Sequence, residues 1–401
     1  CLGHAHPEVN EAIKRQLDRV AHGYRYNFTS DPLEELTEIV AARCGPGLGH
    51  MIFTTGGSES VESALKVALH FHSANGEMSR RHFIARKRSW HGNTLGALSV
   101  SEFKERREPF EGALIPASHL SAVNVYRPPA GVAPEQVAQF CADELEQEIV
   151  RLGARKVAGF IFEPVVGAAG GVVPAPEGYA RQVREICDRH GILMIADEVM
   201  CGSGRCGTWR ALEHDGVSPD IMAVAKGLAA GYVPLGATIY SDKVADLLQR
   251  KAGGPMTGHT FTGHTLACAA GVAVQRIVAR DRLVERVARE GERLKSMLAD
   301  RMGDLPALGD IRGRGFFIGL EFVADRRTKE PFPPERGLHL RIRARSFENG
   351  LICYPMGGNV DGVKGDTVIL APPYNATAEE LGEIVDKLDR SVREALEEPC
   401  K

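Results

Sequence analysis

The chain contains no apolar run that approaches the length of a membrane span. A helix that crosses a bilayer needs roughly 18 or more consecutive apolar residues, and no stretch of the 401 residues comes close to that. No secretory signal opens the sequence. We therefore expect a soluble protein that does not enter a membrane. The sequence begins at Cys1 rather than at Met, so we expect that an N-terminal segment is missing.

The charged residues form no basic stripe. Lys and Arg number 49, Asp and Glu number 52, and the formal net charge is −3. The two signs are mixed along the chain. A protein that binds a phosphate backbone needs a clustered positive surface. This composition therefore argues against nucleic acid as a partner.

The cysteines and histidines lack the spacing of a disulfide framework or a zinc site. Nine cysteines, an odd number, are scattered over the chain, which is typical of reduced thiols in a reducing compartment. No full zinc ligand set is formed by the closest pairs, which are Cys201 with Cys206, His4 with His6, and His259 with His264. We expect a cytoplasmic protein without a metal.

Between residues 33 and 240, stretches of helical periodicity alternate with short apolar runs. This alternation predicts an α/β fold with a mostly parallel sheet covered by helices. The clearest amphipathic helix follows Ser58, which we interpret as its N-cap. Five apolar runs are candidate buried strands, and they span residues 82–85, 157–162, 192–196, 221–225 and 236–240.

The C-terminal part has a different pattern. It predicts helices at 282–301 and 335–349, strands at 316–322 and 367–370, and a last amphipathic helix that carries Leu381 to Leu396. We expect two domains from this change. The large domain is formed by residues 30–281, and a smaller α+β domain by residues 1–29 and 282–401.

Two ionisable residues follow consecutive predicted strands. Asp197 comes directly after the run 192–196, and Lys226 directly after 221–225. Parallel strands bring their carboxyl ends to one edge of the sheet, where α/β proteins bind ligands. Each residue alone is commonly a solvated loop residue or a helix cap. The pair becomes informative together with its neighbours.

A phosphate site and an aromatic face are predicted at the same edge. Gly56-Gly-Ser-Glu-Ser60 leads straight into a helix, whose unpaired backbone N–H groups and positive end can bind a phosphate. Trp90, in Trp90-His-Gly92, follows the run 82–85 and supplies an aromatic face. The alternatives are a plain Gly turn with a Ser cap and an ordinary core Trp.

These parts together indicate pyridoxal 5′-phosphate (PLP) chemistry. The cofactor needs a lysine to form an imine, a carboxylate beside its pyridine nitrogen, a phosphate loop and a stacking aromatic side chain. A buried carboxylate favours the protonated pyridine nitrogen. Partial burial helps the lysine to lose its proton. The combination is much more specific than any one of its parts.

The chain resembles the class III branch of the fold-type-I PLP aminotransferases over essentially its whole length. The matching motifs, in the same order and spacing, are Thr55-Gly-Gly-Ser-Glu59, Trp90-His-Gly92, Phe162-Glu-Pro164, Ala196-Asp-Glu-Val199, Ala225-Lys-Gly227 and Ala371-Pro-Pro373. The resemblance implies a large domain with a mostly parallel seven-stranded sheet between helices, and a smaller α+β domain.

The resemblance also implies roles for single residues. Lys226 corresponds to the Schiff-base lysine and proton-transfer base, and Asp197 to the partner of the pyridine nitrogen. Gly57 and Ser58 hold the phosphate. Val199 packs against one face of the ring, and Trp90, where the family more often has Tyr, packs against the other.

Members of this family are homodimers whose active sites lie at the interface. In them a Thr of the partner subunit reaches the phosphate, and Gly258-His-Thr-Phe-Thr-Gly-His264 resembles that segment, with Thr260 in the matching place. The usual Asn-Pro or His-Pro is His264-Thr265 here. We expect this departure to affect the start of the following helix.

The substrate side departs further from the family. In many relatives Glu163, beside the cofactor, pairs with a C-terminal arginine that admits an α-carboxylate. Here the strand 367–370 and the preceding residues 354–366 contain Lys364 but no Arg. Tyr354 stands where some amine transaminases are basic, so we hypothesise a less acidic or bulkier amine donor.

Two further aromatic residues, Tyr26 and Phe28, are candidates to line the substrate pocket. This stretch approaches the cofactor in relatives, although a place in the core would account for both residues equally well. Together with Tyr354 they complete the predicted substrate side.

The expected reaction is a ping-pong transfer of an amino group from a primary amine or ω-amino acid to a keto acid or aldehyde, with Lys226 moving the proton. The same cofactor supports decarboxylase-transaminase, aminomutase and racemase reactions, which stay open as alternatives.

A dinucleotide-binding dehydrogenase is a weaker alternative function. Gly202-Ser-Gly-Arg-Cys-Gly207 matches the dinucleotide fingerprint, but it lies mid-chain and opens no long helix.

Overall fold

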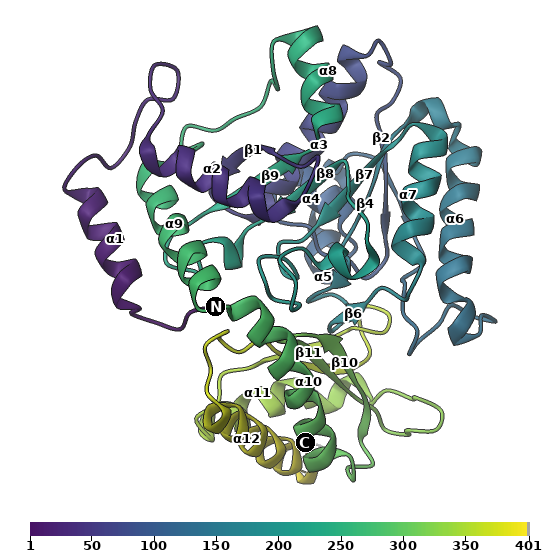
Figure 1. Cartoon of the computed structure of the whole chain (residues 1–401). Coiled ribbons are helices and arrows are strands. Elements are labelled where there is room, and N and C mark those ends of the chain that lie inside the picture. Colours follow the sequence, from purple (N-terminus) through teal and green to yellow (C-terminus); the bar gives the residue numbers. More distant parts are fainter. Residues whose placement is uncertain (399–401) are drawn as a thin grey trace.

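The computed structural model describes residues 1–398. A seven-stranded sheet forms the centre of the larger part of the molecule, in the order β1-β9-β8-β7-β4-β2-β3 (Figure 1). These strands are β1 (His50–Thr54), β9 (Gly236–Tyr240), β8 (Ile221–Val224), β7 (Leu193–Asp197), β4 (Val157–Phe162), β2 (His82–Arg86) and β3 (Ala117–Leu120). The strands from β3 to β8 pair in parallel, whereas β9 pairs antiparallel with both neighbours. The predicted mostly parallel sheet is confirmed.

Alternating side chains send each strand's apolar residues to both faces of the sheet. In β7, Met194 and Ala196 face one cluster, and Leu193 and Ile195 face the other. The first face is covered by α2 (Asp31–Cys44), α6 (Val137–Leu152), α7 (Tyr179–His190) and α9 (Thr265–Arg280). The second face is covered by α3 (Gly57–Ala74), α4 (Leu95–Val100) and α8 (Asp242–Ala252). Because both faces are buried, the central strands read as continuous apolar runs.

A second sheet of four antiparallel strands, in the order β10-β11-β13-β12, lies in the smaller part of the molecule. Its strands are β10 (Leu308–Arg314), β11 (Phe317–Phe322), β13 (Asp366–Leu370) and β12 (Tyr354–Gly357). The helices α10 (Leu283–Met302), α11 (Leu338–Glu348) and α12 (Ala378–Glu397) pack on it and share one apolar cluster with it. Val9 of α1 (Pro7–Leu17) belongs to the same cluster. The domain boundaries at residues 29/30 and 281/282 stay predictions.

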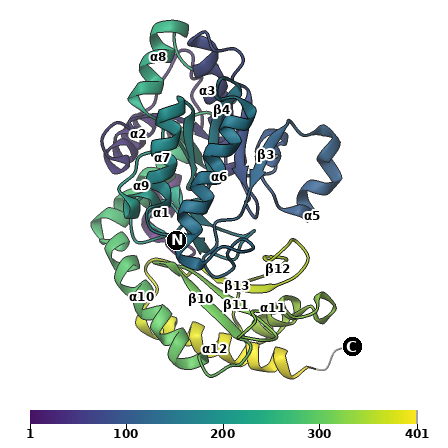
Figure 2. The ribbon, with the colours of Figure 1, turned by 90° about the vertical axis from the view of Figure 1, so that its right-hand side faces the viewer.

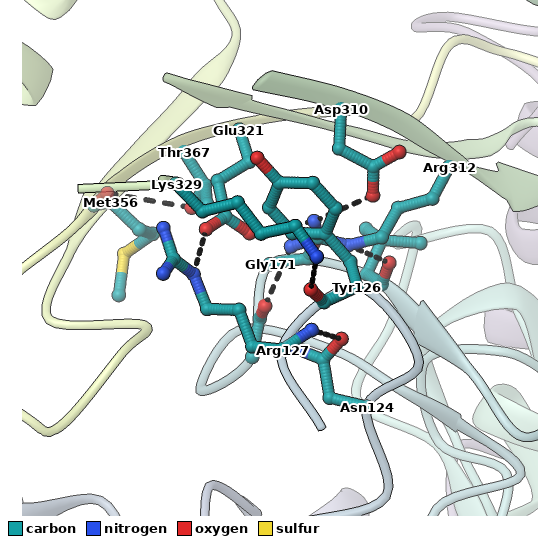
Figure 3. Close-up of polar contacts among 12 residues, drawn as sticks. Asn124, Tyr126, Arg127, Gly171, Asp310, Arg312, Glu321, Lys329, Met356 and Thr367 are labelled. Atoms are coloured by element: carbon teal, nitrogen blue, oxygen red, sulfur yellow. Dashed lines mark hydrogen bonds and ion pairs between the residues drawn. The ribbon is translucent and has the colours of Figure 1, made fainter. Parts of the chain in front are cut away.

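A buried carboxylate ties the two parts together (Figure 3). Glu321 of β11 has a fully buried side chain, and its Oε1 accepts a hydrogen bond from Arg127 Nε at 2.5 Å. Its Oε2 accepts one from Arg312 Nη1 at 2.6 Å. Arg312 also donates to the backbone oxygens of Gly171 and Val172, which lie in the loop between the short strands β5 (Val165–Val166) and β6 (Val173–Pro174). This network fixes the smaller sheet against the loops that follow β3 and β4.

We expect Glu321→Ala to lower the free energy of unfolding by about 3–5 kcal/mol, because the guanidinium of Arg127 loses its carboxylate partner and that of Arg312 keeps only Asp310. Urea denaturation of the cofactor-free protein, followed by circular dichroism, measures the loss. Glu292→Ala is the matched control, since the Glu292–Lys295 pair is exposed at Glu292 and is worth about 0–1 kcal/mol. Equal unfolding midpoints for the two variants would contradict the assignment.

Within residues 1–398 the structure contains neither a membrane-spanning helix nor a disulfide. None of their helices is long and apolar enough to cross a membrane. Their eight cysteines are all free thiols, most of them buried.

Candidate active site

The strand registers place three ionisable residues at one edge of the large sheet. Phe162 of β4 pairs with Ala196 of β7, so Glu163 and Asp197 follow as neighbours. Asp197 in turn pairs with Ala223 of β8, and Lys226 comes three residues later. The parallel arrangement predicted from the sequence therefore brings Glu163, Asp197 and Lys226 to the carboxyl ends of adjacent strands.

Asp197 is held by a buried histidine. The residue is 3% exposed, and its Oδ2 lies 2.8 Å from Nδ1 of His91, whose side chain is fully buried. A carboxylate only accepts hydrogen bonds, so the His91 proton lies on Nδ1. Oδ1 accepts a second hydrogen bond from the backbone N–H of Val199 at 3.0 Å. These contacts fix the carboxylate in one orientation at the end of β7.

Lys226 stands in a tight turn after β8. Its φ of 36° lies in the left-handed region, which costs a non-glycine residue on the order of 1–3 kcal/mol and is concentrated at functional sites. Its side chain is exposed and lines a cavity of about 280 Å³. The burial expected around this lysine is therefore absent within the single chain. Met200 and Gly202, from the loop after Asp197, line the same cavity, whereas Asp197 itself does not.

The Gly-rich turn leads into α3 as predicted, but the cap differs. The helix begins at Gly57 with Gly56 as N-cap, so Ser58 lies inside the first turn and does not cap the helix. The first helical hydrogen bond runs from Ser60 N–H to Gly56 O. The N–H groups of the preceding residues thus lack helical partners and can receive an anion.

Glycines let the backbone close in around this turn. A Cβ on Gly57 would lie 2.7 Å from Cγ1 of Val199, and a Cβ on Gly92 would lie 2.7 Å from Oγ of Ser58. Oγ of Ser58 accepts a hydrogen bond from the N–H of Asn93 at 2.9 Å. Val199, Gly57 and Ser58 are thereby brought together.

Glu163 has no arginine partner. Its Oε1 accepts a hydrogen bond from the N–H of Gly167 and its Oε2 from that of Trp90, at 3.0 and 3.1 Å. Burial is the main cause that raises the pKa of Glu163 to about 7; His91 opposes this shift and the nearby Asp197 carboxylate adds to it. No Lys, Arg or His among residues 1–398 forms an ion pair with it. The absence of the carboxylate gate stays a prediction from the sequence.

Trp90 belongs to a small apolar cluster at the mouth of the site. The cluster also contains Phe103, Ala168, Ala169, Met200 and Met356. Met200 lines the Lys226 cavity as well, so this cluster adjoins that cavity through Met200. Because Met356 lies on β12, this cluster joins the two sheets' domains at the site.

The segment carrying Thr260 is anchored to α3. Nε2 of His259 lies 3.4 Å from Oγ of Ser63, and Nδ1 of His259 lies 3.9 Å from Oε1 of Glu59. Thr260 itself is exposed. The helix after the His264-Thr265 departure, α9, begins at Thr265 with His264 as N-cap and no side-chain capping bond.

The predicted substrate residues are spread over the surface of the single chain. Tyr26 is 72% and Phe28 67% exposed, and neither lines the Lys226 cavity. Their segment lies against residues 258–264, where the rings of His22 and Phe261 are 5.5 Å apart. Tyr354 begins β12 and is 40% exposed. Since residues two apart on a strand share a face, Tyr354 shares the face of Met356 near Trp90.

Two residues of this region, His91 and Met200, were not predicted from the sequence. His91 stands inside the quoted motif Trp90-His-Gly92, and its position next to the aromatic residue was the available signal. Met200 follows Val199 and carried no distinguishing pattern. The fingerprint-like glycines open no helix, and Gly207 instead lets the chain approach Ala288 of α10, where a Cβ would meet the backbone at 2.8 Å.

Comparison with known proteins decides the family. The model of the family "Aminotransferase class-III" matches residues 1–392. The chain belongs to the class III aminotransferases. An uncharacterized aminotransferase of Schizosaccharomyces pombe is 39% identical over 98% of this chain and 86% of the relative. A putrescine–pyruvate aminotransferase of Pseudomonas aeruginosa is 30% identical over 96% of this chain and 82% of that enzyme.

A solved structure extends the likeness to the fold. It is an amine transaminase from an uncultivated Pseudomonas species in a PLP-bound form, 34% identical, with a TM-score of 0.91 over 98% of this chain and 88% of that one. This class III aminotransferase is therefore an enzyme of PLP-dependent fold type I, and its cofactor is PLP. The predicted family, fold and cofactor are confirmed.

The residues present fit this cofactor. The first turn of α3 offers N–H groups without helical partners for a phosphate, and the glycines at 57 and 92 let Val199 and the 91–93 segment approach that turn closely. Asp197 offers a buried, oriented carboxylate, and Lys226 offers an amine at a cavity.

Proposed function

We propose that this class III aminotransferase moves an amino group from a primary amine or ω-amino acid to a keto acid or aldehyde in a ping-pong reaction. The observation that carries the proposal is the register that sets Asp197, held by His91, next to the strand that leads to Lys226. When bound, PLP supplies the electron sink that labilises a bond at the amine-bearing carbon.

Each residue of the site takes one task in this proposal. The N–H groups of Gly57 and Ser58 bind the cofactor's phosphate, and Thr260 of a second subunit completes that contact. Asp197 holds a proton on the pyridine nitrogen. Val199 and Trp90 pack on the two faces of the ring. Nζ of Lys226 would hold the cofactor and would act as the base that moves the proton of the amine-bearing carbon.

The substrate class follows from two observations. Both oxygens of Glu163 are engaged by backbone N–H groups, and Tyr354 stands at the strand that carries no arginine. We therefore propose a donor without an α-carboxylate, such as a diamine or an aryl amine. The putrescine–pyruvate aminotransferase among the relatives supports this choice.

The test is a half-reaction without acceptor. The PLP-loaded protein is mixed with putrescine, β-alanine, 1-phenylethylamine, alanine or glutamate, and its absorbance is followed between about 300 and 500 nm. Conversion of the cofactor to its amine form identifies the donor. Preference for glutamate would contradict the proposed donor class, and conversion by no amine would point to one of the other PLP reactions.

The homodimer is proposed on the exposure of Thr260, Tyr26 and Phe28, which lie on neighbouring exposed segments. A hybrid experiment tests whether Thr260 acts across subunits. Lys226→Ala and Thr260→Asp are each expected to be inactive. Mixing and reassembling the two variants is expected to restore about a quarter of wild-type activity, since half of the dimers are hybrids with one intact site.

The hybrid dimer distinguishes a Thr260 that serves the partner's site from a Thr260 that serves the site of its own subunit. If Thr260 serves the partner's site, an intact Lys226 meets an intact Thr260 in one of the two sites. If Thr260 serves its own site, no hybrid contains a complete site, and an inactive mixture of confirmed hybrid dimers would exclude the proposed sharing. Mixing Lys226→Ala with Asp197→Asn is the control, because both residues belong to the same site and no activity returns.

A further inference from the structure

The short helix α5 (Lys104–Arg107) directly follows Phe103, whose ring packs edge-on against that of Trp90. Figure 2 shows it on the side of the molecule where β12 lies. A Cβ on Gly362, in the loop between β12 and β13, would lie 3.1 Å from Cβ of Lys104. The helix therefore belongs to the rim where the two domains meet.

The guanidinium of Arg106 on this helix is held by two aromatic rings. Its Cζ lies 4.6 Å from the ring centroid of Trp90 and 4.9 Å from that of Phe103. It forms no hydrogen bond or ion pair with residues 1–398, and it is exposed. A guanidinium that stacks on an aromatic ring contacts it with its flat face. Its N–H groups point outward in the plane of the group and can still donate hydrogen bonds.

The other arginines of this region are engaged. Arg107, the next residue, donates to three backbone oxygens, those of Leu98, Ser99 and Ser101, and pairs with Glu111. Arg88 donates to the Glu102 carboxylate and to the backbone oxygen of Gly358. Arg205 lines the Lys226 cavity, but it donates to the backbone oxygens of Phe316 and Pro372. Arg106 is thus the guanidinium at this rim with its donors unused, among the described residues.

Trp90 connects Arg106 to the site. Its backbone N–H binds Glu163, its neighbour His91 binds Asp197, and its ring packs in the cluster with Met200. Met200 of this cluster also lines the Lys226 cavity, so one apolar cluster links the ring that carries Arg106 to that cavity. A planar fork of N–H donors is the group that binds a carboxylate in a bidentate manner.

We propose that Arg106 binds the carboxylate of the keto acid acceptor, and that it takes over the task of the C-terminal arginine that this chain lacks. The proposal rests on the proposed transaminase function. The rings of Trp90 and Phe103 hold the guanidinium in place before the substrate binds. This reduces the conformational entropy that Arg106 loses on binding. An acceptor without a carboxylate, such as an aldehyde, gains nothing from Arg106.

The experiment compares two acceptors in the acceptor half-reaction, so that it does not depend on the donor. The protein is loaded with pyridoxamine 5′-phosphate and mixed with pyruvate or with butanal, and the cofactor absorbance is followed. Arg106→Gln is expected to lower the second-order rate constant for pyruvate by about 10- to 100-fold, the usual range for a lost charge-assisted hydrogen bond. The constant for butanal is expected to change by less than about twofold, and Arg106→Lys to restore part of the loss.

Equilibrium binding gives a second readout. Propanoate, an unreactive carboxylate, is titrated into the PLP-loaded protein and followed by tryptophan fluorescence, to which Trp90 beside Arg106 contributes. Its dissociation constant is expected to rise about 10-fold or more in Arg106→Gln. Lys104→Gln removes the same charge from the same helix and is expected to change neither readout.

An equal loss with pyruvate and butanal would assign Arg106 a structural role and overturn the proposal. Unchanged pyruvate rates and propanoate affinity would overturn it as well. If the wild-type protein converts neither acceptor, the transaminase function fails, while propanoate binding still decides the role of Arg106.

Discussion

Replacing Lys226 by Ala is expected to lower kcat by at least about 10⁴-fold while PLP stays bound. Removing a group that acts both as nucleophile and as proton carrier costs about 10⁴- to 10⁶-fold in other enzymes. In the proposed site the cofactor's phosphate contacts come from the first turn of α3, and Asp197 is held by His91. Neither depends on Lys226, so bound PLP should survive the substitution. The measurements are steady-state kcat and the PLP content after gel filtration.

Two variants sharpen this result. Lys226→Arg keeps the positive charge but does not give up its proton in a protein, so it is expected to be as inactive as Lys226→Ala. Lys251→Ala, at an exposed position of α8, is expected to keep full activity. Turnover of Lys226→Ala within about tenfold of the wild type would remove this lysine from the reaction.

The sequence predicted the interior of both sheets and missed their edges. The five strands predicted in the large sheet are the five interior ones, and the two predicted in the small sheet are also interior. The missed strands β1, β3, β10 and β12 occupy the four edges. Interior strands are buried on both faces and are apolar throughout, as in β4 and β8. Edge strands are paired on one side only, and they contain polar residues, Pro or Gly. Examples are Asp310 and Arg312 in β10 and Pro355 in β12.

The site shows the same division between local and distant information. Asp197 and Lys226 could be predicted to lie at the sheet edge because each directly follows an apolar run, and the turn at Gly57 because it leads straight into an amphipathic helix. The partner of Asp197 could not, since His91 lies 106 residues away and comes from the end of a different strand. Nor could the unused donors of Arg106 be predicted, because its neighbour Arg107 has the same side chain and differs only in its contacts. Which of two adjacent arginines is engaged depends on the tertiary structure alone.

The buried cysteines illustrate how little composition says about position. Burial raises the pKa of Cys187 and of Cys206 to about 12, so neither thiol ionises at neutral pH. Their scattered spacing suggested unpaired thiols, but only the packing makes them unreactive. Cys187 packs in the core of the large sheet, and Cys206 in a smaller apolar cluster with Phe317 and Ile369.

Asp197→Asn is expected to lower kcat by about 10²- to 10³-fold, the range for the loss of one preorganised electrostatic contact. The amide keeps the size of the carboxylate and can still accept a hydrogen bond from Nδ1 of His91. It loses the negative charge that holds a proton on the pyridine nitrogen. The substitution therefore separates charge from shape, and it should also change the absorbance of bound PLP while leaving the unfolding midpoint nearly unchanged.

A matched control comes from the adjacent residue. Glu198 is also a buried carboxylate, but its oxygens accept hydrogen bonds from the N–H groups of Ala211 and Leu212, and burial raises its pKa to about 7. Glu198→Gln is expected to change stability more than turnover, because it faces the 3₁₀ turn at Ala211–Asp215 and not the cofactor. If Asp197→Asn and Glu198→Gln lowered kcat equally, the effect would be one of packing. A large loss in Asp197→Asn alone, with the absorbance shift, would assign the charge of Asp197 to the cofactor.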